Sequence, residues 1–504
     1  MMTAQSVTPG YPLHVLLRDL VETPLVGDVY VSGLATHSRN ARPGDLFIAA
    51  TIGGNSGILY INDAVQAGAC AVVAEAGALP DPYLCPVPLY RIQNLWAKTG
   101  IIADRFYRHP SSAMTVVGVT GTNGKTTVSH LLAQSLAAPD KGVCGLIGTL
   151  GYGTPDNLMP GPNTTPEPVT LHGLLADMRA RNIRQVVMEV SSHGLDKQRI
   201  AGVEFDMAIL TNLSRDHLDY HITLENYAAV KRRLFTEYQI SQAVINLDDD
   251  FGSSLAGELK AEVAGYTLSP RPERGTKRKH PVVSGSIVSC GEGEMHMEVD
   301  SPWGRALLVS PLLGRFNAYN LLACLSALCL LGHPLDYAVS RLSACRCIPG
   351  RMEYFGGDRQ PLVVVDYAHT PDALEQVLET LKAACRGKIY CVFGCGGDRD
   401  QGKRPLMGTV AERYADHIIL TSDNPRSENP DLIIRDILGG IQNSGQVTVV
   451  ADRAAAITHA AHAAGANDIV LIAGKGHEDY QEIAGRRLPF SDQQIVRKLL
   501  EDRS

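Results

Sequence analysis

The octet Thr120-Gly121-Thr122-Asn123-Gly124-Lys125-Thr126-Thr127 follows the apolar run Met114–Thr120 and opens a helical pattern. Glycines in such a turn let backbone N–H groups approach a phosphate, and the start of the following helix favours an anion. In this pattern we expect Lys125 on the β- and γ-phosphates of ATP and the Thr126 hydroxyl on Mg²⁺. The standard P-loop has one more glycine, where this chain has Val119. The residues predicted to bind ATP here are Gly121, Thr122, Asn123, Gly124, Lys125, Thr126 and Thr127.

Short apolar runs alternate with amphipathic stretches on both sides of this loop, which is typical of α/β domains. The strands expected are Val29–Val31, Leu46–Ala49, Ala71–Ala74, Met114–Thr120, Gln185–Val190, Met207–Leu210, Ala243–Asn246, Leu362–Asp366, Lys388–Phe393, His417–Thr421, Val447–Val450 and Asp468–Ala473. Helices are expected over Ala373–Leu381 and Asp431–Ile441. In an open α/β sheet the ligands lie beyond the carboxyl ends of the strands.

Three domains are predicted. The length of 504 residues suggests about three domains at roughly 150 residues each, and Pro349-Gly350 is a plausible boundary. The predicted domains are a small α/β N-terminal domain at residues 1–98, a central P-loop ATPase-like α/β domain at 99–348, and a C-terminal Rossmann-like α/β domain at 349–504.

Composition and charge exclude several classes of protein. The formal net charge is -7, whereas a general nucleic-acid binder carries a basic excess. The longest largely apolar run, Leu321–Leu331, is about half of what a membrane span requires, and the first twenty residues carry no secretion signal. The 11 cysteines form no CxxC pair, which argues against a disulfide framework or a zinc ribbon. We expect a cytoplasmic protein without a membrane span or a nucleic-acid partner.

Taken together with later motifs, the octet resembles the ATP-binding loop of the Mur ligases. These are the ATP-dependent enzymes that add amino acids in peptidoglycan precursor synthesis. The similar segments extend in order over nearly the whole chain: Asn163–Thr165, Glu189–Leu195, Asn212–His221, Gly314–Asn320, Asp366–Pro371, Gly394–Asp400 and Gly474–Glu478. Within the family, this set is most similar to the enzymes that add the third peptide residue.

The resemblance implies an amide ligase. Its expected reaction joins meso-2,6-diaminopimelate to the D-glutamate γ-carboxyl of UDP-MurNAc-L-Ala-D-Glu through an acyl phosphate, and releases ADP and phosphate. The expected partners are these small molecules, and we expect a monomer. Metal ions and fixed cations would neutralise the crowded phosphate and carboxylate charge in such a reaction.

Lys231 interrupts the apolar face of a predicted helix that starts after Thr223. The other residues of that face are Leu224, Tyr227, Ala228, Leu234 and Phe235. One interpretation is a lysine whose stem packs on the face while its ammonium stays at the rim. The family pattern implies instead that Lys231 is carbamoylated by CO₂, which would give Mg²⁺ the oxygen ligands it prefers.

The resemblance also implies roles for other residues of the ATP and metal sites. The implied Mg²⁺ ligands are Thr126, Glu189, His217 and carbamoylated Lys231. The implied catalytic residues are Lys125, Glu189, His217 and Lys231. Asn317 and Asp249 look like the adenine and ribose side of the nucleotide site, and Arg351 and His369 like phosphate contacts from the third block. Taken alone, Glu189 can also be a cap or ion-pair partner and Asp249 a turn carboxylate.

Further residues match the family's site for the nucleotide-sugar acceptor. The uridine side is implied at Thr36, Ser38, Gly53, Gly54 and Asn55. The pyrophosphate, sugar and peptide arm are implied at Asn163, Thr164, Thr165, Ser191, Lys197 and Arg199. His37 replaces the usual acidic residue before the serine, and Lys197 stands where a glutamine is common, so both contacts depart from the pattern.

Asp423-Asn424-Pro425-Arg426 follows the expected strand His417–Thr421. Asn-Pro fixes a turn at the end of a strand, where a ligand can lie. Diaminopimelate is a lysine-like amine with an extra carboxylate, which a planar guanidinium can grip through two parallel hydrogen bonds. The segment is similar to that of the diaminopimelate-adding ligases, whereas lysine-adding relatives lack the arginine. The resemblance adds Arg399, Gly474 and Glu478 to this amino-acid site.

Several alternatives stay open. A lysine-adding member of the same family conflicts with Arg426, and a folylpolyglutamate synthase-like ligase conflicts with the long N-terminal block and its Ser38-Arg39 signal. A P-loop switch or motor ATPase would hydrolyse ATP without an amino acid. A dinucleotide-binding oxidoreductase is a poor match, because Gly394-Cys395-Gly396-Gly397 does not follow GxGxxG.

Overall fold

The computed structural model describes residues 10–22, 27–52, 55–137, 142–269, 280–291, 293–357 and 360–501. Across these ranges the chain folds into two compact units. The first comprises Met1–Gly118, Pro139–Asp206 and Glu237–Ile240, and the second comprises Val119–Ala138, Met207–Thr236 and Ser241–Ser504. Strand β9 (Thr115–Thr120) carries the chain from the first unit into the second.

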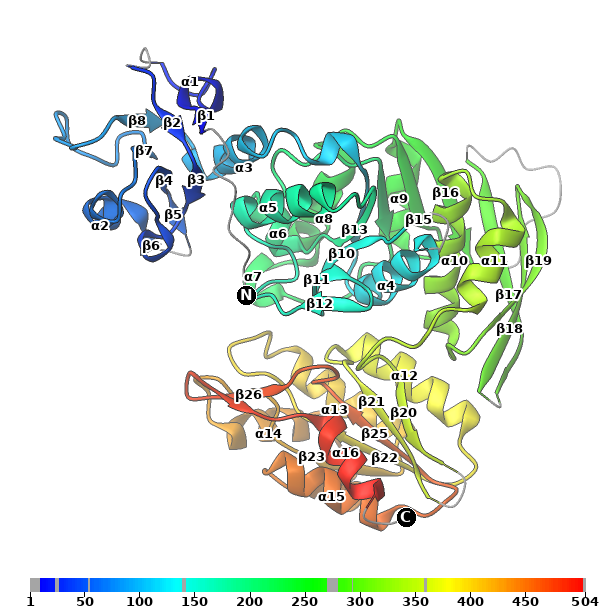
Figure 1. Cartoon of the computed structure of the whole chain (residues 1–504). Coiled ribbons are helices and arrows are strands. Elements are labelled where there is room, and N and C mark those ends of the chain that lie inside the picture. Colours follow the sequence, from blue (N-terminus) through cyan, green and yellow to red (C-terminus); the bar gives the residue numbers. More distant parts are fainter. Residues whose placement is uncertain are drawn as a thin grey trace. The chain divides into compact units, whose positions relative to one another are not determined.

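The N-terminal part of the first unit is a parallel sheet with strand order β3-β4-β7-β8 (Figure 1). Strand β4 is buried along its whole length because Leu46 and Ile48 pack on one face and Phe47 and Ala49 on the other. Both faces of the sheet are covered, which explains its uninterrupted apolar runs. The elements here are β1 (Tyr11–Pro12), α1 (Leu13–Leu16), β2 (Tyr30–Val31), β3 (Gly33–Ala35), η1 (Ser38–Asn40), β4 (Asp45–Ala49), β5 (Thr51–Ile52), β6 (Asn55–Ser56), η2 (Gly57–Tyr60), α2 (Ile61–Gln66), β7 (Ala71–Glu75), β8 (Leu89–Ile92) and α3 (Leu95–Phe106).

The rest of the first unit pairs strands in the order β12-β11-β10-β13. Strands β10 and β13 run parallel, with Leu146 opposite Val187. The elements are η3 (Ser111–Ala113), β10 (Gly145–Gly148), β11 (Gly151–Thr154), β12 (Asn157–Met159), α5 (Pro168–Ala180), β13 (Gln185–Glu189) and α6 (Ser192–Asp196).

In the second unit, strands pair in the order β14-β15-β16-β17-β18-β19, and helix α10 packs on α4 and on β15, β16 and β17. Helix α10 is apolar nearly all round, which fits a helix buried between two layers. The elements are α4 (Lys125–Leu136), β14 (Met207–Leu210), α7 (Leu218–His221), α8 (Leu224–Thr236), β15 (Gln242–Asn246), α9 (Asp250–Glu258), β16 (Glu262–Thr267), β17 (Val282–Gly291), β18 (Glu294–Ser301), β19 (Gly304–Ser310), α10 (Arg315–Leu330) and α11 (Leu335–Ser343).

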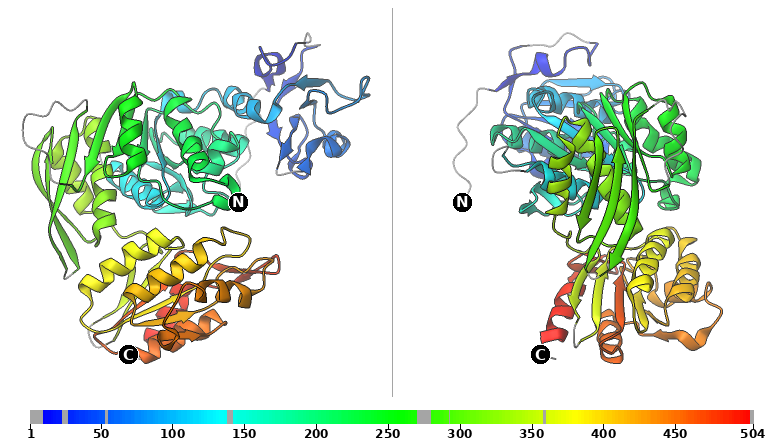
Figure 2. Two further views of the ribbon diagram at one scale, coloured as in Figure 1. Left: turned by 180° about the vertical axis from the view of Figure 1, so that it is seen from behind. Right: turned by 90° about the vertical axis from the view of Figure 1, so that its right-hand side faces the viewer.

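The C-terminal sheet has the order β20-β21-β25-β22-β23-β24, with parallel pairing from β21 to β24. Alternate residues of its strands pack on α12, α13 and α14 on one face and on α15 and α16 on the other. Figure 2 shows the ribbon of this sheet and its helices, coloured yellow to red, from two further directions. The elements are β20 (Glu353–Gly356), β21 (Leu362–Asp366), α12 (Pro371–Ala384), β22 (Ile389–Phe393), α13 (Lys403–Tyr414), β23 (His417–Leu420), α14 (Pro430–Leu438), η4 (Ser444–Gln446), β24 (Val447–Val449), α15 (Arg453–Ala463), β25 (Ile469–Ala473), β26 (Tyr480–Ile483), β27 (Arg486–Pro489) and α16 (Asp492–Glu501).

The predicted α/β class is confirmed, and every expected strand and helix is present with ends shifted by a few residues. The division at residues 98 and 348 stays a prediction. None of the helices in the described ranges combines the length and apolar character needed to cross a membrane. All 11 cysteines are free thiols, as expected.

Candidate active site

The loop after β9 is held by the segment that follows β14. The N–H groups of Thr122 and Asn123 donate to the carbonyl oxygen and to Oδ1 of Asn212, and Thr211 Oγ1 donates to the carbonyl oxygen of Asn123 at 2.6 Å. A Cβ at Gly121, where φ is +146°, would lie 1.9 Å from Thr211 Oγ1. Only glycine fits there, so the segment after β14 constrains the conformation of the loop. Val119, the departure from the standard loop, is a buried residue of β9.

Two lysines converge on the carbonyl oxygen of Gly121. Lys125 Nζ donates to it at 3.0 Å, and Lys231 Nζ donates to it at 2.7 Å. Lys231 is 1% exposed, and its Nζ lies 4.4 Å from the ring centroid of Tyr227. The rim position considered for its ammonium is therefore wrong, whereas the predicted face of α8 is confirmed at Tyr227, Leu234 and Phe235. Leu224, at the start of that face, is 40% exposed.

Burial, together with the charge of Lys125, lowers the pKa of Lys231 well below its ordinary value. Two ammonium groups that share one carbonyl oxygen repel each other, and Lys231 is too deeply buried for water to stabilise its charge. Lys231 is therefore the member of the pair that tends to be a neutral amine. A neutral amine is a nucleophile, while an ammonium is not.

Asp216 connects the loop after β14 to the C-terminal sheet. Its Oδ2 lies 3.4 Å from His217 Nε2 and 3.7 Å from His369 Nε2, and its Oδ1 lies 4.0 Å from Lys403 Nζ. Burial by itself raises the pKa of Asp216, but the hydrogen bond from His369 and the charges of His217, His369 and Lys403 hold it well below its usual range. The predicted residues His217 and His369 thus meet at one ionised carboxylate.

Arg351 reaches the first residues of α4 in the second unit. Its Nη2 donates to Thr126 Oγ1 at 3.1 Å, and its guanidinium lies 4.3 Å from the ring centroid of Tyr367. Its Nε is buried without a hydrogen-bond partner among the described residues. An orphaned guanidinium N–H beside a helix N-terminus is suited to an anion. Burial and the charge of Arg351 lower the pKa of His130 to about 4 and that of His477 to about 3, so both imidazoles stay neutral.

Asn317 lies in the first turn of α10 and is 3% exposed. Its Nδ2 donates to the carbonyl oxygen of Leu313, and its Oδ1 accepts from Asn320 Nδ2. Asn320 in turn adjoins the phosphate loop, because a Cβ at Gly124 would lie 2.5 Å from Asn320 Oδ1. Asp249 caps α9 by accepting from Gly252 N–H and also accepts from Leu213 N–H.

The first unit gathers a separate set of predicted residues. Glu189 is fully buried at the end of β13, where Oε1 accepts from Thr149 N–H at 2.8 Å and Oε2 from Thr149 Oγ1 at 3.0 Å. Thr149 Oγ1 also lies 3.1 Å from Thr164 Oγ1. Thr165 Oγ1 lies 3.1 Å from Ser191 Oγ.

Arg199 joins this set because its Nη1 donates to the carbonyl oxygen of Thr165 at 3.1 Å. Its Nε is buried and has no hydrogen-bond partner within the described ranges. The carbonyl oxygen of Asn163 accepts from Tyr152 Oη, and that of Lys197 accepts from Trp96 Nε1 at 2.7 Å. The structure thus brings Thr164, Thr165, Glu189, Ser191 and Arg199 together.

The predicted uridine residues lie at the carboxyl ends of parallel strands. Thr36 and Ser38 follow β3, and Asn55 begins β6 shortly after β4. His37 Nε2 lies 3.9 Å from Glu167 Oε2. Gly53 and Gly54 lie outside the described residues.

The amino-acid residues predicted in the last block converge on one edge of the C-terminal sheet. Arg399 follows β22, Asp423–Arg426 follow β23, and Gly474 and Glu478 follow β25, and these three strands are parallel neighbours. A Cβ at Gly474, where φ is +112°, would lie 2.4 Å from Asp423 Oδ2. A Cβ at Gly396 would lie 2.8 Å from Arg426 Nη1 and 3.7 Å from Arg399 Cγ, so the two arginines flank this glycine.

Arg426 is held from both sides. Its Nη1 donates to the carbonyl oxygen of Gly397 at 2.7 Å, and its Nε lies 3.6 Å from Glu482 Oε2. Its backbone pairs with the hairpin β26–β27 through Glu482 and Ala484, and its φ is +52°. The left-handed backbone costs free energy that the surrounding contacts must offset, which is common where a side chain is aimed at a ligand.

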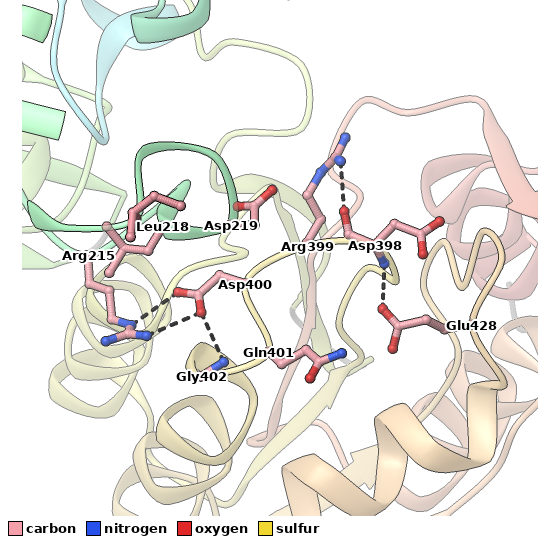
Figure 3. Close-up of a pocket in the computed structure, with 10 residues that line it drawn as sticks. Arg215, Leu218, Asp219, Asp398, Arg399, Asp400, Gln401, Gly402 and Glu428 are labelled. Carbon is pink, nitrogen blue, oxygen red and sulfur yellow. Dashed lines mark hydrogen bonds and ion pairs between the residues drawn. The ribbon is translucent and has the colours of Figure 1, made fainter. Parts of the chain in front are cut away.

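Arg399 lines a cavity of about 670 Å³ between the loop after β14 and the loop after β22 (Figure 3). Arg215 closes one side through a bidentate pair with Asp400, at 3.1 and 3.2 Å. The cavity holds charges of both signs, which suits a zwitterionic ligand. Its lining comprises Arg215, Leu218, Asp219, Ile222, Asp398, Arg399, Asp400, Gln401, Gly402 and Glu428.

The residues implied to hold a metal ion are Thr126, Glu189, His217 and Lys231. Among the described residues there is no group of three or more His, Cys, Asp or Glu side chains that could hold a metal ion. Hydroxyl, carboxylate and carbamate oxygens are nevertheless ligands that Mg²⁺ accepts, and it usually keeps water and substrate phosphate as further ligands. The donor chemistry fits Mg²⁺ bound together with a nucleotide.

Sequence reasoning missed several residues of this site. Asp216 lies inside the quoted segment Asn212–His221, but nothing in the local pattern shows that it meets His369. Asp372 accepts from Asn123 Nδ2 at 2.8 Å, yet it lies between the quoted segment Asp366–Pro371 and the expected helix Ala373–Leu381 and was assigned to neither. Lys403 and Lys475 are buried lysines, which is the rare state for this residue type, yet no helical period flagged them as it did Lys231.

Two family models match this chain. The model described as the Mur ligase middle domain matches residues 119–328, and that described as the Mur ligase glutamate ligase domain matches residues 350–476. A relative from Coxiella burnetii, a UDP-N-acetylmuramoyl-L-alanyl-D-glutamate–2,6-diaminopimelate ligase, is 47% identical over 96% of this chain and 98% of its own. A solved structure of a ligase of that name is 35% identical with a TM-score of 0.67, and covers 98% of this chain and 99% of its own.

The fold is also shared with more distant structures. The MurF ligase from Thermotoga maritima, solved in complex with ADP, is 19% identical with a TM-score of 0.65, over 95% of this chain and 100% of its own. At this identity the likeness concerns the fold alone. The predicted three-domain α/β architecture is consistent with these structures.

Proposed function

The chain belongs to the Mur ligase family, and from this premise we propose that it joins meso-2,6-diaminopimelate to UDP-MurNAc-L-Ala-D-Glu with ATP. Relatives that match this chain over nearly their whole length are named for this activity. The observation that carries the proposal is Arg426, whose guanidinium is held at the carboxyl edge of the C-terminal sheet by the carbonyl oxygen of Gly397 and by Glu482. Such a group recognises the carboxylate that distinguishes diaminopimelate from lysine.

The reaction proceeds in two steps. A γ-carboxylate oxygen of D-glutamate attacks the γ-phosphorus of ATP, which forms an acyl phosphate and releases ADP. The unprotonated amine of diaminopimelate then attacks the acyl carbon, phosphate leaves with the bonding electrons, and the nitrogen loses a proton as the amide forms. Lys125 and Arg351 bind the phosphates. Lys125 is the first residue of α4, the Arg351 guanidinium donates to Thr126 in the same turn, and its Nε has no protein partner in the described ranges.

The remaining predicted residues receive roles by their location. One hydrogen-bonded group in the first unit contains Thr164, Thr165, Ser191 and Arg199. The Nε of Arg199 has no hydrogen-bond partner within the described ranges and is suited to the pyrophosphate or a peptide carboxylate of the acceptor. Thr36 and Ser38 follow β3 at the edge where α/β sheets bind ligands, and we assign the uridine to them. We retain domains at 1–98, 99–348 and 349–504, and a monomeric protein in the cytoplasm, as parts of the proposal.

Thr126, Glu189, His217 and the modified Lys231 are the residues that would hold Mg²⁺. The ion would neutralise phosphate charge during both steps. In the protein itself, Asp216 fixes the ring of His217, and Thr149 holds both carboxylate oxygens of Glu189. These contacts orient the two side chains before a nucleotide binds.

We propose that Lys231 reacts with CO₂, so that Nζ bonds the carbon to give a carbamate and releases one proton. Burial of the amine and its closeness to Lys125 support the reaction, because a neutral amine can attack CO₂ and the ammonium of Lys125 would attract the carbamate that forms. In the ATP–Mg²⁺ complex supplied with isotope-labelled bicarbonate, we expect a carbamate carbon signal in NMR that is absent from Lys231→Arg. A density map or a mass spectrum of the intact complex that shows only the unmodified amine would contradict the carbamate.

A coupled assay of ADP release tests the function as a whole. We expect turnover only when ATP, diaminopimelate and UDP-MurNAc-L-Ala-D-Glu are all present, since the first step needs the acceptor carboxylate and the second step uses the amine to consume the acyl phosphate that the first step forms. L-lysine in place of diaminopimelate is expected to lower kcat/KM by several orders of magnitude, because Arg426 would be left without its carboxylate. Equal ADP release without either co-substrate would indicate a plain ATPase, and equal use of L-lysine would indicate the lysine-adding alternative.

A further inference from the structure

Lys475 is a buried lysine that neither the sequence motifs nor the proposed reaction assigns to a role. It lies in the loop after β25, and its side chain is 0% exposed. Its Nζ donates to Asn424 Oδ1 at 3.0 Å and to Glu478 Oε2 at 2.8 Å. The ring centroid of Tyr480 lies 5.4 Å from the same nitrogen. The ammonium is therefore fully engaged by an amide, a carboxylate and an aromatic face.

These contacts fix the side chain of Asn424 in one orientation. Its Oδ1 accepts from Lys475 and also from the N–H of Glu482 at 2.9 Å, while its Nδ2 donates to Glu478 Oε2 at 2.8 Å. A flipped amide would point its NH₂ group at two donors and its oxygen at a carboxylate. Without Lys475, one of the two donors that impose this orientation would be lost.

The same contacts leave one oxygen of Glu478 open. Oε2 accepts from both Lys475 and Asn424, whereas no hydrogen bond reaches Oε1 from the part of the chain that is described. A carboxylate with one oxygen held by two donors has its other oxygen in a fixed direction. That oxygen suits a ligand ammonium, because a charge-assisted hydrogen bond is the strongest it can accept.

Glu478 is connected to Arg426 through Asn424 and strand β26. Glu482 donates its N–H to Asn424 Oδ1, and its carbonyl oxygen accepts from the N–H of Arg426 at 3.0 Å. Glu478, Asn424 and Arg426 are thus linked through one residue of β26. A ligand carbon that bears both an ammonium and a carboxylate could meet Glu478 with the first and Arg426 with the second.

Stability alone explains the buried cation poorly. A buried ion pair contributes little net stability, since well-packed apolar side chains of similar volume often serve as well or better. The C-terminal domain already contains a buried pair of this kind with a structural role, Arg453 with Asp492, whose guanidinium also donates to the carbonyl oxygen of Ala473. Lys475 differs because both of its polar partners are predicted ligand contacts.

We propose that Lys475 is a positioning residue for recognition of the far ammonium of diaminopimelate. It holds Asn424 and Glu478 in one array, so that Glu478 Oε1 receives that ammonium while Arg426 receives the far carboxylate. This role of Lys475 rests on the proposed function. It deepens that function because the far amine is recognised by Glu478, and the far carboxylate by a different residue, Arg426.

The test compares diaminopimelate with 2-aminopimelate, an analogue that keeps the far carboxylate and lacks the far ammonium. In Lys475→Met we expect KM for diaminopimelate to rise at least about tenfold, because a charged hydrogen-bond array is lost. KM for ATP and for the UDP-linked acceptor should change less than about twofold, and kcat less than about threefold, since the reacting groups are elsewhere. The wild-type preference for diaminopimelate over 2-aminopimelate should largely disappear in the variant.

Four further proteins separate positioning from folding. Lys382→Met removes an exposed lysine that pairs with Asp416 in the same domain, and should leave every constant unchanged. The double variant Lys475→Met/Glu478→Gln should be no worse for diaminopimelate than Glu478→Gln alone, because Lys475 acts through Glu478. If Lys475→Met does not fold, Lys475→Gln, which keeps a donor and loses the charge, is measured instead and should show the same shift in KM and in preference.

A folded Lys475 variant with an unchanged KM for diaminopimelate, or with the wild-type preference over 2-aminopimelate, would overturn the inference. So would equal losses for all three substrates, which would indicate a purely structural lysine. Failure of the proposed function has a different signature, because wild-type protein would then show no diaminopimelate-dependent release of ADP.

Discussion

Replacement of Arg426 by alanine is expected to lower kcat/KM for diaminopimelate by about 10³-fold. The guanidinium is the cation best placed to pair with the far carboxylate, and without it that anion would have to leave water without a partner. Steady-state kinetics with each substrate varied in turn measures the effect. KM for ATP should stay within about twofold of the wild-type value, because Arg426 is not among the residues proposed for the nucleotide.

Two variants define what is lost in Arg426→Ala. Arg426→Lys keeps a positive charge but cannot make two parallel hydrogen bonds, so its activity should fall between that of wild type and that of the alanine variant. Arg435→Ala removes an exposed arginine from the neighbouring helix α14 and should behave as wild type. Discrimination against L-lysine should collapse in Arg426→Ala, since lysine never uses the guanidinium. Unchanged kinetics with diaminopimelate would refute the assignment of this residue.

Replacement of Lys125 by alanine is expected to lower kcat by at least about 10³-fold. Its ammonium lies at the phosphate loop, where it donates to the carbonyl oxygens of Gly121 and Thr122. Charge builds up on the phosphate oxygens as the acyl phosphate forms, and a fixed cation there acts most strongly in the transition state. ADP release in the complete assay measures the loss, and calorimetric titration with nucleotide separates binding from chemistry.

The controls for Lys125 address charge and folding. Lys125→Arg keeps the charge but places a wider group in a loop whose backbone is pinned by Thr211 and Asn212, so we expect only partial activity. Lys388→Ala, at an exposed lysine of the C-terminal domain, should have full activity. Turnover near the wild-type rate in a folded Lys125→Ala protein would show that phosphate is bound elsewhere.

Much of the fold could be predicted because its signals are local. The parallel strands β21, β22, β23 and β25 of the C-terminal sheet are buried, so each one reads as a largely apolar run. The antiparallel strands β17, β18 and β19 were not predicted, although Glu294–Ser301 alternates between exposed and buried residues as a half-exposed strand does. That period-2 signal was available and was overlooked beside the stronger runs.

The site was predicted less completely than the fold. Lys231 was singled out because a helical period can show which residues share a face, but only the folded chain shows that its Nζ meets the carbonyl oxygen of Gly121, 110 positions earlier. Asp216 and His369 are similarly remote in sequence and adjacent in space. Asp249 was expected near ribose, and the structure shows its carboxylate capping α9.

The order of residues along the chain was enough to determine the α/β class, the strand–turn–helix around Lys125 and the position of Asp423–Arg426 after a strand. These features depend on backbone geometry and side-chain period, which act over a few neighbouring positions. Tertiary structure alone decided that Lys475 pairs with Asn424, 51 positions away. Parallel strands joined by helices bring their carboxyl ends to one edge of a sheet, and only there do loops that are distant in sequence exchange hydrogen bonds.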